Sequence, residues 1–159
     1  MKISMTTRKI LLIIHILFSA IMFGNMVTFL ILSIKIATTD NPILIESSYQ
    51  IMHLLSSTSI KASTIGATLT GVLLSVLTKW GLFKYYWIIV KQVMTLLLIG
   101  INIWGMYSWT LNALNQFEQT SIQTFHTNLW VGIIVQLTSL IFIFAISVFK
   151  PWSKRTTKK

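Results

Sequence analysis

The sequence contains no cysteine, two prolines and three acidic residues among its 159 residues. Without cysteine the chain cannot form a disulfide, a cysteine-ligated zinc or iron–sulfur site, or a thiol nucleophile. Charged residues make up 10% of the chain, whereas soluble domains carry roughly 25%. This leaves too little polar surface to cover a soluble fold, and a hydrophobic content of 54% excludes a disordered chain.

Long, mostly apolar runs occupy most of the sequence. A helix that crosses a membrane needs about 20 mostly apolar residues, and four segments reach that length. We predict one integral membrane domain over residues 1–159, with spans at residues 10–34, 58–78, 85–109 and 128–149. The first run exceeds the apolar core of a signal peptide, which is about 7–15 residues, so we interpret it as a retained helix.

Most of the 13 basic residues lie at the end of the predicted bundle opposite the three acidic residues. Ten basic residues lie before the first span, between the second and third, or after the fourth, where residues 150–159 form a polybasic tail. All three acids fall on the other side, as Asp40, Glu46 and Glu118. Because lysine and arginine stay on the cytoplasmic side of membranes, this pattern predicts cytoplasmic termini. It also explains the net charge of +10 by orientation and contact with anionic headgroups, without a nucleic-acid partner.

Small residues recur every four positions in the second span. They are Ser59, Ser63, Ala67, Gly71 and Ser75, and this spacing places them on one helix face. Helices in lipid associate through close packing of such residues, so we expect Ser63, Ala67, Gly71 and Ser75 to contact a neighbouring helix. With short loops, the spans then favour an all-α, up-down-up-down four-helix bundle.

Ionisable residues inside a membrane are costly and are candidates for function. Lys91 lies about two turns into the third span and His15 about one turn into the first, both on the basic side. We predict that they converge above the aromatic turn containing Trp80 and Trp87, forming a pocket for an anionic or quinone-like headgroup. Alternatively, Lys91 reaches outward to the headgroups and His15 bonds a neighbouring helix. We expect Lys61, near the outer edge of its span, to reach the headgroups.

Two other histidines allow a different interpretation. His53 and His126 are predicted at similar depth near the outer ends of their helices, and two imidazoles facing each other across a bundle can ligate haem b. Asn25, Asn102 and Gln136 fall near mid-membrane, where we expect them to join helices by hydrogen bonds. The sequence contains no catalytic triad, metal-ligand spacing or phosphate-binding loop. We therefore expect no catalytic residue, no metal site and no cofactor beyond this haem alternative.

The residues around the predicted inner turn resemble a known family. Thr70-Gly71 is followed by a short apolar run and then by Trp80-Gly81-Leu82, Lys84, Tyr86-Trp87 and Val90-Lys91, with His15 in the first helix. Over roughly residues 8–105, this pattern resembles the DUF2269-type small integral membrane proteins of bacteria. The resemblance implies a four-helix fold in a bacterial cell membrane and brings no established activity. His53 has no counterpart in that pattern.

Three functions fit these features. The first is a non-enzymatic membrane module that assists a partner, either itself or another membrane protein, or that binds a lipid-like ligand. The second is a membrane redox protein that holds haem b or quinone. The third is a small transporter working as a dimer, although no predicted span contains an acidic residue to line a solute path.

Overall fold

The computed structural model of the chain describes residues 4–78, 81–115 and 122–151, and the side chains of all of these except 122–126. The described residues form helices and no strand. Four helical segments are long and apolar enough to cross a membrane: Met5–Ala37, Pro42–Leu77, Tyr86–Asn115 and Thr127–Phe149. The prediction of an all-helical chain with four long helices is therefore confirmed.

Two of the long helices are interrupted by a single π-helical turn. The elements in chain order are α1 (Met5–Ala37), α2 (Pro42–Leu55), η1 (Ser56–Ile60), α3 (Lys61–Leu77), α4 (Tyr86–Gly100), η2 (Ile101–Gly105), α5 (Met106–Asn115) and α6 (Ile122–Phe149). A π turn hydrogen-bonds five residues along instead of four, and such turns occur frequently at functional sites. Neither η1 nor η2 was predicted from the sequence.

The connections at the two ends of the bundle use residues suited to turns. Asn41 accepts a hydrogen bond from the backbone N–H of Ile43 at 3.0 Å, and Pro42 occupies the start of α2, where its missing N–H is not needed. At the other end, Gly81 has a φ of +65°, a left-handed conformation that glycine adopts without strain. These residues allow both reversals to be short.

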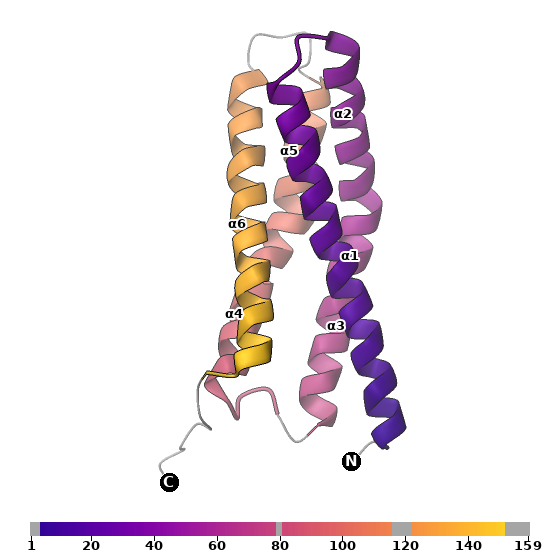
Figure 1. The fold of residues 1–159 in the computed structure, drawn as a ribbon, viewed down its shortest axis with the longest axis vertical. Coiled ribbons are helices and arrows are strands. Elements are labelled where there is room, and N and C mark those ends of the chain that lie inside the picture. Colours follow the sequence, from indigo (N-terminus) through magenta and orange to yellow (C-terminus); the bar gives the residue numbers. More distant parts are fainter. Residues whose placement is uncertain (1–3, 79–80, 116–121, 152–159) are drawn as a thin grey trace.

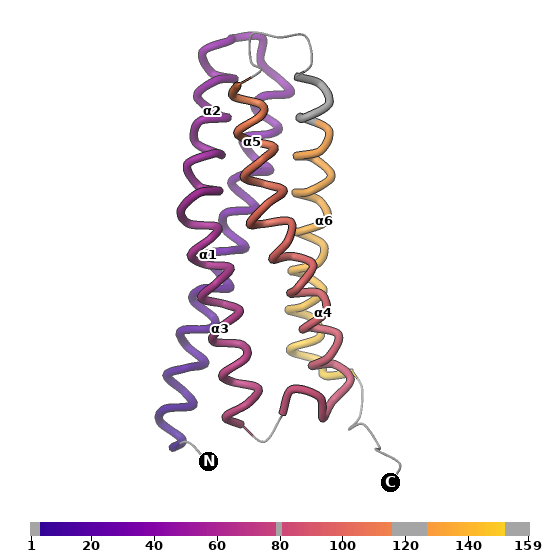
Figure 2. Tube along the Cα trace, turned by 180° about the vertical axis from the view of Figure 1, so that it is seen from behind, coloured from indigo at the N-terminus to yellow at the C-terminus, as the bar shows by residue number. Residues whose placement is uncertain are grey.

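The helices pack as two pairs that are joined at one end. The start of α1 and the end of α6 lie at the same end of the bundle (Figure 1). Near that end α3 packs along α1, whereas α4 packs along α6, and the two pairs diverge in both views (Figures 1 and 2). In the opposite half α2 and α5 pack together, α2 also packs against α1, and α5 also packs against α6. We call the diverging half the basic end, because Arg8, Lys84 and Lys150 belong to it.

The main core lies in the middle and in the half opposite the basic end. Its fully buried side chains include Met26, Phe29, Tyr49 and Met106. A smaller cluster at the basic end consists of Trp87, Ile88 and Ile146. Many large apolar side chains remain exposed on the outside of the bundle, including Leu69, Leu96, Leu97 and Ile141. An apolar exterior of this kind is what a helical bundle presents to lipid.

Candidate functional site

His15 of α1 is held against α3 at the basic end. Its Nδ1 lies 2.9 Å from Thr70 Oγ1, and that hydroxyl donates its proton to the carbonyl of Gly66 at 2.6 Å. Because a threonine hydroxyl has one proton to give, His15 Nδ1–H must be the donor to Thr70. Gly71 makes room for the ring, since a Cβ there would lie 3.2 Å from His15 Cε1. In the neutral form of the imidazole, this tautomer leaves Nε2 as an acceptor.

Lys91 of α4 connects to α6 at the same end of the bundle. Its Nζ donates to Ser147 Oγ at 2.7 Å and lies 5.8 Å from the centroid of the Trp87 ring. Ser147 in turn donates to the carbonyl of Ile143 at 2.8 Å. A lysine ammonium has three protons to donate, and within the described residues Ser147 accepts one of them. Ser147 was not among the residues singled out from the sequence, because it lies two residues from the inner end of its predicted span, whereas Lys91 lies six residues from the inner end of its own.

The two predicted site residues therefore lie on different helix pairs. Among the described residues, His15 bonds to Thr70 and Lys91 bonds to Ser147, and they are not bonded to each other. Trp87 is buried beside Lys91, whereas Trp80 lies outside the described residues. A pocket formed by all four residues remains a prediction.

The small-residue face of the second span turns toward α1. Ser63 and Ala67 are buried, while Gly71 and Ser75 are half-buried. The ring of Phe18 packs directly against Gly66, which lies beside this face. A Cβ added to Gly66 would lie 2.6–2.7 Å from three atoms of that ring. Close approach of α1 and α3 thus depends on small side chains in α3.

Buried amides and hydroxyls form a polar layer in the middle of the bundle. Asn25 and Ser59 exchange two side-chain hydrogen bonds of 2.9 and 3.2 Å between α1 and η1. Asn102 Nδ2 donates to Thr64 Oγ1 at 3.0 Å, joining η2 to α3, and the Thr64 hydroxyl faces Met22 Sδ at 3.6 Å. These bonds match the helix-joining role expected for Asn25 and Asn102.

A second group of titratable residues lies in the half opposite the basic end. His53 Nδ1 is 3.2 Å from Thr110 Oγ1, and its ring stands 5.0 Å from that of Tyr107, centroid to centroid. Lys61 Nζ lies 4.1 Å from the Tyr107 centroid, in a cation–π contact. Lys61 therefore contacts a neighbouring helix instead of only extending to the headgroups, because an aromatic face is within reach.

The haem alternative is not tested by this geometry. The side chain of His126 lies outside the described residues, so haem ligation by His53 and His126 remains a prediction. Within the described part of the chain, no group of three or more His, Cys, Asp or Glu side chains is placed to hold a metal ion. His53 keeps Nε2 for a further interaction, because its contact with Thr110 uses Nδ1.

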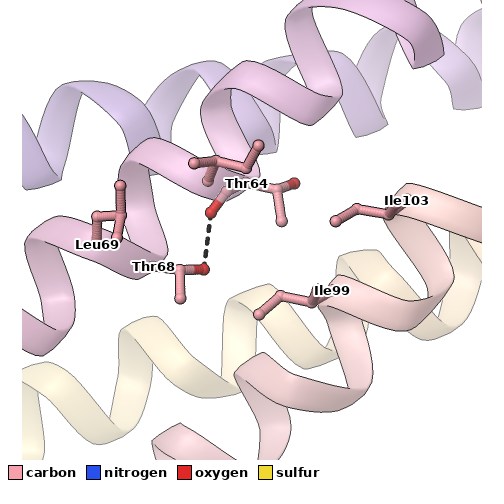
Figure 3. Close-up of a pocket in the computed structure, with 6 residues that line it drawn as sticks. Thr64, Thr68, Leu69, Ile99 and Ile103 are labelled. Atoms are coloured by element: carbon pink, nitrogen blue, oxygen red, sulfur yellow. Dashed lines mark hydrogen bonds between the residues drawn. The ribbon is translucent and has the colours of Figure 1, made fainter.

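A groove of about 130 Å³ lies between α3 and the α4–η2 segment (Figure 3). Its lining consists of Thr64, Ile65, Thr68, Leu69, Ile99 and Ile103. The Thr68 hydroxyl is satisfied by the carbonyl of Thr64 at 2.7 Å, so the groove presents apolar surface. It is separate from His15 and Lys91, which do not line it.

Comparison with known proteins found no matching family model, no matching curated protein and no matching solved structure. Among the described residues, Lys91 offers a positive charge that makes one hydrogen bond, to Ser147. The middle layer offers neutral amides, and His53 contacts Thr110.

Proposed function

We propose that this chain is a multi-pass protein of a bacterial cell membrane with its basic end in the cytoplasm. Four apolar helices of sufficient length support the membrane assignment. The segregation of ten basic residues from three acids supports the orientation. The bacterial origin, like membership of the DUF2269-like family, is supported by the sequence resemblance around Trp80-Gly81-Leu82.

We further propose that the protein is a non-enzymatic module whose basic end binds anionic lipid headgroups. The observation that carries this proposal is the environment of Lys91. Its ammonium is anchored by Ser147, while no described residue of that end is acidic. A phosphate oxygen is a suitable acceptor for the remaining protons, and the acceptor nitrogen of His15 suits a headgroup hydroxyl.

Lipid selectivity tests this function. The purified protein is placed in nanodiscs that contain equal amounts of phosphatidylglycerol and phosphatidylcholine, and lipids retained after gentle delipidation are counted by native mass spectrometry. We expect enrichment of phosphatidylglycerol, and Lys91→Met should reduce it about fivefold, since one lysine near an anionic surface contributes about 1 kcal/mol.

The matched control is Lys35→Met, which removes the same charge from the exposed, opposite end of α1. It should leave the enrichment unchanged. Addition of inorganic phosphate separates headgroup recognition from simple phosphate binding, because free phosphate should not displace the lipid. Equal retention of the two lipids, or equal effects of the two substitutions, would refute the proposed headgroup site.

A further inference from the structure

Two carboxamides are completely buried in the middle of the bundle without a full set of partners. Asn102 and Gln136 are each 1% exposed. Asn102 Nδ2 donates to Thr64, but Asn102 Oδ1 and both polar atoms of Gln136 have no hydrogen-bond partner within the described part of the chain. In a membrane core the free-energy penalty for unpaired polar groups is large. We therefore expect a small polar molecule to bind here and to form hydrogen bonds with these atoms.

The contact between Lys91 and Ser147 places the two amides at a similar depth. That contact aligns α4 with the antiparallel helix α6. Asn102 follows Lys91 by eleven residues, and Gln136 precedes Ser147 by eleven residues. Each amide is therefore about 16 Å further along the bundle axis from the same contact.

Both amides also face the same core. The residues about one turn before and after each amide belong to a single buried cluster: Leu98, Met106, Ile133 and Leu140. Asn102 is itself part of η2, which lies against η1. Helix α6 packs on α4 and on α5, the segments before and after η2. Both amides are therefore buried in the same interior, near the level of the π turns.

We propose that a buried water molecule bridges Asn102 and Gln136 at this level. The water donates its two protons to Asn102 Oδ1 and Gln136 Oε1, and it accepts one from Gln136 Nε2. This gives three hydrogen bonds, the usual number for a buried water. A cation would face the donor Nε2 and an anion would face two acceptors, so a small neutral guest with donors and an acceptor fits this set best.

Solid-state NMR of the full chain in lipid bilayers tests the proposal. Magnetisation is transferred from water protons to the side-chain NH₂ groups of ¹⁵N-labelled protein. Asn25, which is buried at a similar level but paired directly with Ser59, serves as the internal control. We expect Asn102 and Gln136 to receive water magnetisation severalfold faster than Asn25. Rates no faster than that of Asn25 would overturn the proposal.

A substitution in α6 then tests whether one water serves both amides. Gln136→Met keeps the length of the side chain and removes its polar atoms, so it should slow the transfer to Asn102 severalfold, although Asn102 lies on another helix. Gln50→Met, at an exposed glutamine bonded to Glu46, should leave that rate unchanged. An unaltered Asn102 rate in Gln136→Met would exclude the bridge. If this variant does not fold, the comparison with Asn25 in the unmodified protein decides the question.

Discussion

Replacing Gly66 by leucine is expected to push α1 away from α3 and to destabilise the bundle by about 1–3 kcal/mol, as overpacking does in soluble cores. The ring of Phe18 lies directly on this glycine, with three ring atoms 2.6–2.7 Å from the position of an added Cβ. Neither helix can move to make room for the leucine without losing contacts between α1 and α3. Thermal unfolding in a mild detergent measures the effect.

The matched control for this experiment is Gly100→Leu. A Cβ at Gly100 would meet nothing within 4 Å, so this variant should melt at or above the temperature of the unmodified protein, because leucine is a better helix former than glycine. Adding Phe18→Ala to Gly66→Leu should recover part of the loss. Equal melting temperatures for the two leucine variants would show that Phe18 does not pack on Gly66 at the interface between α1 and α3.

Removal of the Trp109 side chain is expected to cost about 3 kcal/mol, the lower end of the range for tryptophan in soluble cores, because this residue is half-buried. Its ring covers two glycines: a Cβ on Gly132 of α6 would lie 2.5 Å from Cζ3, and one on Gly105 would lie 2.9 Å from Cη2. Alanine at position 109 would leave a void between α5 and α6 that neither glycine can fill. The drop in melting temperature of Trp109→Ala reports this loss.

Trp104 provides the comparison, since the same substitution there removes a ring that is 79% exposed. Trp104→Ala should change the stability by no more than about 0.5 kcal/mol, as is usual for surface positions. A loss as large as that of Trp109→Ala would indicate that the two rings contribute in a different way, for example through contact with the detergent or lipid.

The number and the approximate limits of the long helices follow from the sequence because charges bound them. Lys9 and Lys35 bracket the uncharged part of the first helix, and α1 extends a few residues past both. The helix that contains Lys61 begins at Pro42, because Asn41 and Pro42 supply a helix start well before the apolar run. Hydropathy locates the apolar part of a helix, whereas capping residues determine its ends.

The sequence did not predict which side chains contact each other across the helices. Asn102 was expected to join helices, but its partner Thr64 is 38 positions away, and periodicity specifies a face without specifying what lies opposite. The same holds for Lys61, whose contact with Tyr107 depends on how α3 and α5 are placed. Hydropathy does not predict the π turns. The extra residue in such a turn changes the direction of the side chains that follow it, but it does not change the composition of the helix.

The orientation of the basic end is the claim on which the lipid proposal depends, and cysteine labelling tests it most directly. Because the chain has no cysteine, a single introduced thiol reports one position against an unlabelled background. Glu118→Cys and Lys84→Cys are expressed separately in bacterial cells and treated with a membrane-impermeant maleimide. We predict that Glu118→Cys is labelled in intact cells and that Lys84→Cys is labelled only after the membrane is opened. Labelling of Lys84→Cys but not of Glu118→Cys in intact cells would contradict the account.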